Sequence, residues 1–198
     1  MKARLSQQDF ERAAQTLNVD VAAIRAVVAV EASGEGFLVD GRPKVLFERH
    51  WFRRLTNNRF NQSHPDLSNL KPGGYARGAT AEERMIREWV RLDRAMDLDR
   101  KAAMESASWG LPQILGVNHK AAGCATIDEF YFKMFESEGT QLDLMVNFLR
   151  SKRLDVFLRN RDWAGFARRY NGPQFAKNRY DEKLATSYRY FIRPGRKS

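Results

Sequence analysis

The chain has 198 residues, of which 43% are hydrophobic, and it carries a formal net charge of +10 at pH 7. This length and composition exclude an intrinsically disordered or fibrous chain and predict one globular domain over residues 1–198. The single cysteine, Cys124, excludes a fold stabilised by internal disulfide bonds, and we expect neither a secretory signal nor a membrane-spanning segment.

Capping residues and helical spacing predict helices through most of the chain. The first helix is expected over residues 6–17, with Ser6 as its N-terminal cap. The second is expected over residues 21–32, where Asn18 and Asp20 are the capping candidates.

Two capping boxes begin further helices. After the box at Thr80, five apolar residues share one face of the predicted helix: Met85, Ile86, Trp89, Leu92 and Met96. The box at Thr126 begins a helix that Gly139 is expected to end. Later helices are predicted over residues 142–149, in the segment "DWAGFARRY", and over about residues 175–192, the last of them basic.

Strand signals occur in one segment, "FLVDGRPKVLFE", where two apolar runs flank the turn dipeptide formed by Asp40 and Gly41. This pattern predicts a β-hairpin directly after the second helix. Residues 57–78 are polar and rich in Asn, Ser, Pro and Gly, which is typical of a long loop. The predicted fold class is therefore α+β, mostly α, with one small β-hairpin.

Glu31 has an unusual position for a charged residue. In a helix over residues 21–32 it shares a face with Ile24, Val27 and Val28, so it lies on the stripe that faces the core. Loss of hydration raises the pKa of a carboxyl group, and a proton retained near neutral pH is what a general acid needs. The alternative is a structural glutamate bonded to a neighbouring arginine or backbone amide.

Two further carboxylates lie on the predicted hairpin, Glu48 at the end of its second strand and Asp40 in its turn. A helix ending in one carboxylate, followed by a hairpin bearing others, can place acids on opposite walls of a cleft. Two such groups flanking a glycosidic bond are the usual machinery for hydrolysing it. The alternative for Glu48 is an ion pair with Arg49 or Arg53.

Three segments carry a family resemblance: "VEASGEGFLVDGRPKVLFERHWF", "SASWGLPQILG" and "RRYNGP". They resemble segments of lysozyme-like and soluble lytic transglycosylase domains, and more closely the N-acetylmuramidase family of phage endolysins and prophage lysins. The resemblance spans roughly residues 22–190. It implies a lysozyme-like fold that cleaves peptidoglycan between N-acetylmuramic acid and N-acetylglucosamine.

The resemblance also implies roles for individual residues. Glu31 corresponds to the general acid and Glu48 to the second carboxylate, while Asp40 stays a candidate for activating water. Four residues match positions that in lysozyme-like domains lie on or beside the cleft: Ser108, Gln113, Tyr170 and Asn171. Trp109 and His50 are further candidates for lining it, by residue type and position. For Trp109 and Tyr170 the alternative is core packing, and for His50 it is a buried imidazole bonded to the backbone.

Two other activities fit parts of the sequence. A lytic transglycosylase also uses a protonated glutamate but does not require a second carboxylate. A basic binding module for nucleic acid or anionic surfaces would explain the net charge, although it leaves Glu31 unexplained. The three histidines and Cys124 have no metal-ligand spacing, so we expect no metal and no cofactor.

The expected partner is bacterial peptidoglycan, and we expect no binding to nucleic acid. The chain is expected to be a monomer. An anionic outer membrane is a second expected partner, through an amphipathic face of the basic C-terminal helix. The family resemblance further implies accumulation in the host cytoplasm, without a signal peptide, and release to the periplasm through a membrane pore.

Overall fold

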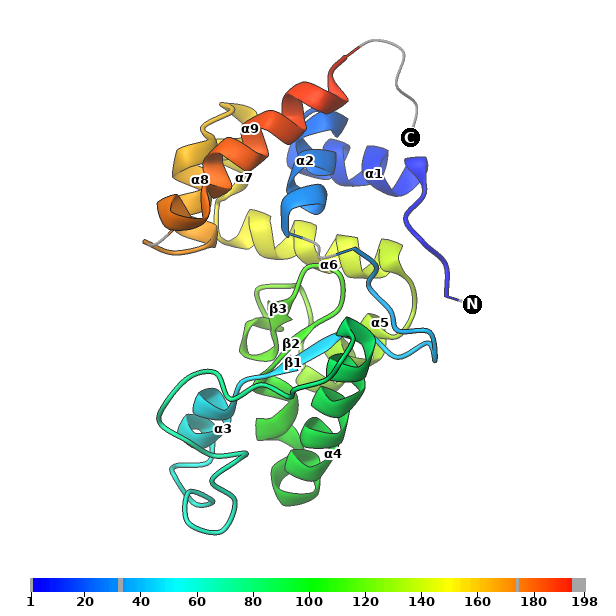
Figure 1. Cartoon of the computed structure of the whole chain (residues 1–198). Helices are drawn as coiled ribbons and strands as arrows, with labels where there is room; N and C mark the ends of the chain where they lie inside the picture. Colours follow the sequence, from blue (N-terminus) through cyan, green and yellow to red (C-terminus); the bar gives the residue numbers. More distant parts are fainter. Residues whose placement is uncertain (1, 32–33, 174, 194–198) are drawn as a thin grey trace.

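The computed structural model describes residues 2–31, 34–173 and 175–193, and it confirms a mostly helical α+β fold (Figure 1). The α-helices are α1 (Gln7–Leu17), α2 (Val21–Glu31), α3 (Arg49–Leu55), α4 (Ala81–Glu105), α5 (Ile127–Met134), α6 (Glu138–Ser151), α7 (Asp155–Arg159), α8 (Trp163–Tyr170) and α9 (Tyr180–Phe191). Two short 3₁₀ helices cover Gly116–Asn118 and Phe175–Asn178.

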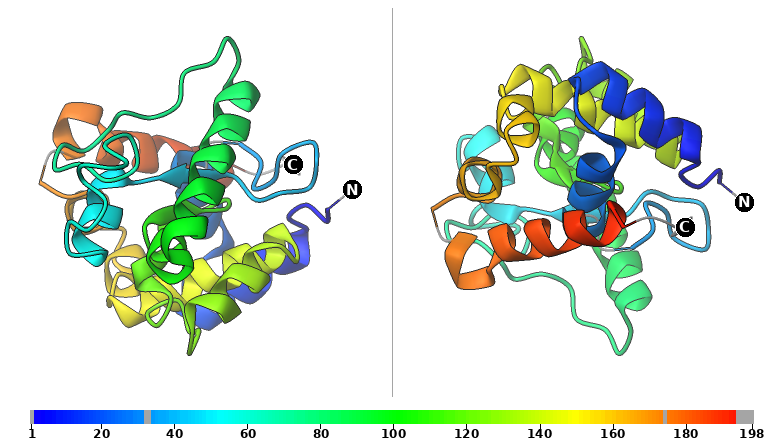
Figure 2. Two further views of the ribbon diagram at one scale, coloured as in Figure 1. Left: turned by 90° about the horizontal axis from the view of Figure 1, so that it is seen from below. Right: turned by 90° about the horizontal axis from the view of Figure 1, so that it is seen from above.

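The helices form two groups on either side of α6, which crosses the middle of the molecule (Figure 1). One group contains α1, α2, α7, α8 and α9, and the other contains α3, α4 and α5 with the small sheet (Figures 1 and 2). In the first group α9 lies along α2 and buries Leu184 and Tyr188. The end of α2 therefore points from the helical group toward the group that holds the sheet.

Helix caps follow the predicted chemistry. Ser6 forms a capping box with Asp9 at the start of α1, and the Asp20 carboxylate accepts a hydrogen bond of 2.8 Å from the backbone N–H of Ala23. The hydroxyls of Thr80 and Thr126 each accept a bond from the backbone N–H three residues on. These side chains satisfy N–H groups that have no partner inside a helix.

Three helix predictions need correction. Gly139 does not end a helix, because it lies in the first turn of α6, where a β-carbon would come within 2.6 Å of the Asp9 carboxylate on α1. Ile86 is 39% exposed, although Trp89 and Leu92 on the same predicted face are buried. The basic C-terminal segment is not one helix, because Arg179 has a φ of +52° and separates the 3₁₀ turn from α9.

The sheet differs from the predicted hairpin. Strand β1 (Val45–Phe47) pairs antiparallel with β2 (Ala107–Trp109), and β2 pairs with β3 (Ile114–Leu115). The expected first strand contributes only one isolated bridge, between Phe37 and Pro43. The turn at residues 38–42 does form, since the Leu38 N–H donates to the Arg42 carbonyl at 2.8 Å. The hairpin is thus a loop, and the sheet is completed by a distant segment.

Within the described residues, no single helix combines the length and hydropathy of a membrane span. Helices α1 and α2 reach that length and hydropathy only when taken together, and they are bent by 109° relative to each other.

Candidate active site

Glu31 is the last residue of α2, and its carboxylate faces the end of α8. The side-chain N–H₂ group of Asn171, the C-terminal capping residue of α8, donates to both carboxylate oxygens, at 3.2 Å and 3.0 Å. Within the part of the chain that the structure describes, no arginine or lysine forms an ion pair with Glu31. The predicted alternative, a glutamate neutralised by an arginine, is therefore not what holds this side chain.

Burial raises the pKa of Glu31 above its usual value of 4.5, and this is the largest influence on the group. The hydrogen bond from Asn171 and the positive charge of Lys183 on α9 act in the opposite direction without cancelling the effect of burial. A half-buried carboxyl group with a raised pKa and a neutral hydrogen-bonding partner has the properties of a proton donor.

Tyr170 connects Glu31 to the sheet. Its hydroxyl group donates to the carbonyl of Pro112 at 3.4 Å, in the turn between β2 and β3, and its ring stacks on Phe166. Burial, and secondarily the charge of Glu31, raise the pKa of Tyr170, so the phenol stays protonated. The predicted cleft residues Tyr170 and Asn171 are thus adjacent to Glu31, and Tyr170 reaches across to the turn that carries Gln113.

Gln113 has a left-handed backbone, with a φ of +49°, and its side-chain N–H₂ group donates to the Gly110 carbonyl at 2.8 Å. The side chain of Gln141 on α6, which is fully buried, holds this turn in place. Its oxygen accepts from the Leu111 N–H at 2.7 Å, and a β-carbon on Gly110 would lie 2.8 Å from its side chain. Left-handed non-glycine residues cost energy and are often found at functional sites.

Buried polar residues on α6 were missed by sequence reasoning. Besides Gln141, Glu138 is buried and accepts a hydrogen bond of 2.7 Å from the Gly36 N–H, which fixes the loop after Glu31. Glu138 and Gln141 share a face with Leu142 and Met145, at spacings of three, four and seven residues. Polar side chains on an apolar face were the signal that could have found them.

Glu48 lies where predicted, directly after β1 and before α3. The hydroxyl of Tyr75 donates to one carboxylate oxygen at 2.9 Å, and the other oxygen lies 3.3 Å from Nδ1 of His50. The geometry of the His50 contact is not that of a hydrogen bond, and neither of its two atoms has such a bond within the described residues. The predicted alternative fails for Arg49, whose guanidinium donates to the Lys71 carbonyl.

The loop that carries Tyr75 is anchored by Glu88 of α4, which is 1% exposed. Its carboxylate accepts hydrogen bonds from the backbone N–H groups of Phe47 on β1 and Ala76 in the loop, and it pairs with Arg91 at 2.9 Å. One buried carboxylate therefore ties strand, loop and helix together beside Glu48. Sequence reasoning missed Tyr75 because a polar loop offers no periodicity, and it missed Glu88 although that residue shares a helix face with Met85 and Leu92.

Three other predicted residues lie in different surroundings. Asp40 is exposed in the 38–42 turn, where it pairs with Arg42 at 2.6 Å, a contact that lowers the pKa of the carboxyl. Trp109 is fully buried and donates to the Met104 carbonyl, so it is a core residue and offers no face for a sugar ring. Ser108 is half-buried in the middle strand of the sheet.

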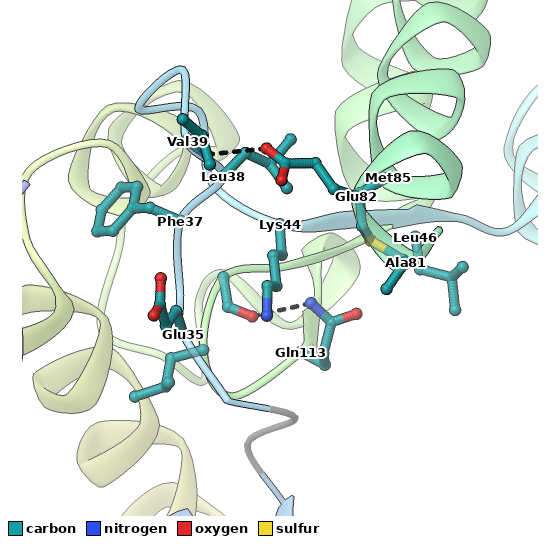
Figure 3. A pocket seen from close by; sticks show the side chains of 12 residues that line it. Glu35, Phe37, Leu38, Val39, Lys44, Leu46, Ala81, Glu82, Met85 and Gln113 are labelled. Atoms are coloured by element: carbon teal, nitrogen blue, oxygen red, sulfur yellow. Dashed lines mark hydrogen bonds between the residues drawn. The ribbon is translucent and has the colours of Figure 1, made fainter. Parts of the chain in front are cut away.

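A cavity of about 550 Å³ opens beyond Gln113, between the 35–39 loop, β1 and the start of α4 (Figure 3). Its lining residues are Glu35, Phe37, Leu38, Val39, Lys44, Leu46, Ala81, Glu82, Met85, Gly110, Leu111 and Gln113. A second pocket, of about 580 Å³, lies between α2 and α9 and includes Lys183. Neither Glu31 nor Glu48 lines either pocket, so the cavity adjoins the turn of Gln113 rather than enclosing the carboxylates.

Comparison with known proteins decides the family, since the profile of the N-acetylmuramidase family matches residues 20–191. The chain belongs to the N-acetylmuramidase family. The crystal structure of the Burkholderia AP3 phage endolysin is similar, with 39% sequence identity and a TM-score of 0.86 over 95% of this chain and 71% of that chain. A search of curated protein sequences finds no match. This muramidase is therefore a glycoside hydrolase that acts on peptidoglycan, and its lysozyme-like fold is as predicted.

Proposed function

We propose that this muramidase is an endolysin that cleaves the bond between N-acetylmuramic acid and N-acetylglucosamine, with Glu31 as general acid and Glu48 as second carboxylate. The observation that carries the proposal is the environment of Glu31. It combines a pKa raised by burial with an amide partner in place of an ion pair. Burial of this kind favours the protonated carboxyl group that a general acid needs.

Asn171 supports proton transfer in both directions. Its N–H₂ group donates to both oxygens of the ionised carboxylate, so it stabilises the charge that forms as Glu31 gives up its proton. Rotation of the amide presents its oxygen, which accepts a bond from the protonated carboxyl group. The same residue therefore serves Glu31 before and after the transfer.

Glu48 supplies negative charge for the oxocarbenium-like centre, attacks that centre, or activates water. The Tyr75 hydroxyl at 2.9 Å fixes the direction of its carboxylate, whose second oxygen is buried beside His50 and accepts no hydrogen bond within the described residues. A lytic transglycosylase needs no such residue, because the hydroxyl of the sugar itself attacks. The presence of a second carboxylate at this position therefore supports the proposal of hydrolysis.

Mass spectrometry of peptidoglycan digested by the pure protein tests the proposed reaction. Hydrolysis between the two sugars leaves reducing N-acetylmuramic acid ends that carry one added water. A digest dominated by anhydro-muramic ends would replace the hydrolase by a transglycosylase, and reducing N-acetylglucosamine ends would move the cleaved bond.

We also propose contact with an anionic outer membrane, but through fewer residues than a basic amphipathic helix would offer. Helix α9 contains two acidic and two basic residues, and Leu184 and Tyr188 on its apolar face are buried. Among the described residues of this C-terminal segment, the exposed large hydrophobic side chains are Tyr190 and Ile192, at 47% and 52%. Leakage from anionic vesicles should therefore fall in a Tyr190→Ser, Ile192→Ser double variant that still clears purified walls; unchanged leakage would remove this proposal.

We further propose that the enzyme accumulates in the host cytoplasm and reaches the periplasm through a pore made by another protein. Expression in a bacterial cytoplasm should then leave cells intact until a pore-forming protein is co-expressed. Lysis without such a protein would contradict the route.

A further inference from the structure

We propose that the cavity beyond Gln113 binds the peptide stem that muramic acid carries, so that the enzyme recognises the peptide as well as the sugars. The inference rests on the proposed function, because it assumes that the glycan is cleaved beside Glu31. It assigns a ligand class, a short peptide with carboxylate and amine groups, to a cavity that the catalytic residues do not line.

The cavity adjoins a turn that also contacts Tyr170, the neighbour of Asn171 in the proposed catalytic site. Gly110 and Gln113 line it, and they belong to the turn whose Pro112 carbonyl receives the hydroxyl of Tyr170. On the other side its wall begins at Glu35, four residues after Glu31. The stem is attached to a side group of the muramic acid ring, so a glycan bound beside Glu31 brings its peptide toward a neighbouring hollow.

Most of the lining is apolar, whereas a sugar ring presents hydroxyl groups around its edge. Apolar side chains from the loop, β1, α4 and the turn form most of the wall: Phe37, Leu38, Val39, Leu46, Met85 and Leu111. Among the polar side chains, Gln113 donates to the Gly110 carbonyl, and Glu82 accepts from the Val39 N–H at 3.3 Å. Alanine methyl groups, which peptide stems contain, suit such a surface.

The charges around the cavity match those of a stem. Lys44 extends into the middle of the space, while Glu82 and Glu35, which is paired with Arg4 at 2.6 Å, lie on opposite sides of it (Figure 3). Peptide stems carry free carboxylates, which pair with an ammonium group, and a diamino acid whose amine pairs with a carboxylate. A cation between two carboxylates therefore complements a short peptide that bears both signs of charge.

The test compares two substrates in the same assay: intact peptidoglycan strands, and the same strands stripped of their stems by an amidase. We expect the wild-type kcat/KM to be about tenfold higher on the strands with stems, the size of effect that one charge-assisted contact produces. In Lys44→Gln this preference should disappear, through a lower kcat/KM on the strands with stems alone. Lys101→Gln, an exposed lysine of α4, has the same change in net charge and should keep the preference.

A second variant changes an exposed residue, so that a loss of activity cannot be explained by a loss of folding. Val39 is 89% exposed and lines the cavity, so Val39→Asp removes apolar surface there without disturbing the core. It too should lose activity on the strands with stems only. Equal wild-type kcat/KM on both substrates, or equal losses on both in the two variants, would overturn the inference. Failure of the proposed function is separate, because it appears as a Glu31→Gln protein that still cleaves both substrates.

Discussion

Glu31 and Glu48 are the same amino acid in two different environments. Glu31 ends an apolar helix and meets a side-chain amide, and burial raises its pKa. Glu48 caps a short helix on the opposite group of elements, where it faces the phenol of Tyr75 and the imidazole of His50. Burial favours the protonated form of the first carboxyl group, whereas the second accepts a hydrogen bond from a phenol.

The different roles proposed for the two carboxylates therefore follow from their different neighbours. The neighbours of Glu31 come from α8 and α9, and those of Glu48 come from the 57–78 loop and α3. Each carboxylate can therefore be perturbed without touching the other.

Glu48→Gln should have the largest effect among the changes on the Glu48 side. Loss of its charge should lower kcat about 10²-fold, the usual size for removing one stabilising group from a transition state. Initial rates of wall clearing, with a thermal melt to confirm folding, measure it. Activity near that of the wild type would mean that Glu31 works without a charged partner, as in a transglycosylase.

Asn171→Ala tests the Glu31 side. The hydrogen bond from Asn171 lowers the pKa of Glu31, so its removal should raise that pKa further. Because activity requires the protonated acid, the alkaline limb of the pH–rate profile should move to higher pH, while kcat falls about tenfold as the stabilised product state is lost. A limb that stays in place would show that another group controls it.

Tyr75→Phe makes the matching change beside Glu48. It removes one hydroxyl group, and we expect kcat to fall about threefold to tenfold with little change in KM, since a neutral hydrogen bond is of that size. The alkaline limb set by Glu31 should stay where it is. Tyr190→Phe on α9 is the control and should behave like the wild type. A shift of the alkaline limb in Tyr75→Phe would break the separation between the two environments.

Asp40→Asn should have the smallest effect. The carboxylate of Asp40 is paired with Arg42 in an exposed turn, so we expect kcat/KM within about twofold of the wild type, as for most surface changes. A loss comparable to that of Glu48→Gln would make Asp40 the water-activating residue that the sequence left open.

The sequence predicted those features that depend on local patterns. The apolar stripe placed Glu31 at a helix end facing the interior, and the caps at Ser6, Thr80 and Thr126 set the starts of helices. Pairings between distant segments were missed. The partner of β1 lies in "ASW", where apolar and polar residues alternate over three positions, too few to predict a strand.

The same limit applies to the candidate site. Sequence pattern and family resemblance selected Asn171 and Tyr170, which the structure brings to Glu31. They could not select Tyr75, because only the folded loop brings it to Glu48. Trp109 was open between sugar binding and core packing, and only its burial decides for the core.

The most direct test of the account is Glu31→Gln, assayed for wall clearing beside its own thermal melt. Burial raises the pKa of Glu31 in the folded protein above its usual value of 4.5. Ionisation of Glu31 therefore lowers the stability of the folded protein as the pH rises from the unfolded-state pKa to the folded-state pKa. Glutamine does not ionise, so the variant avoids this loss of stability at neutral pH. We predict that Tm at pH 7 is equal to that of the wild type or higher, by up to about 2–4 °C, with no difference at acid pH. Activity should fall about 10²–10⁴-fold, the contribution of a general acid. A folded Glu31→Gln protein that clears walls at close to the wild-type rate would contradict the account.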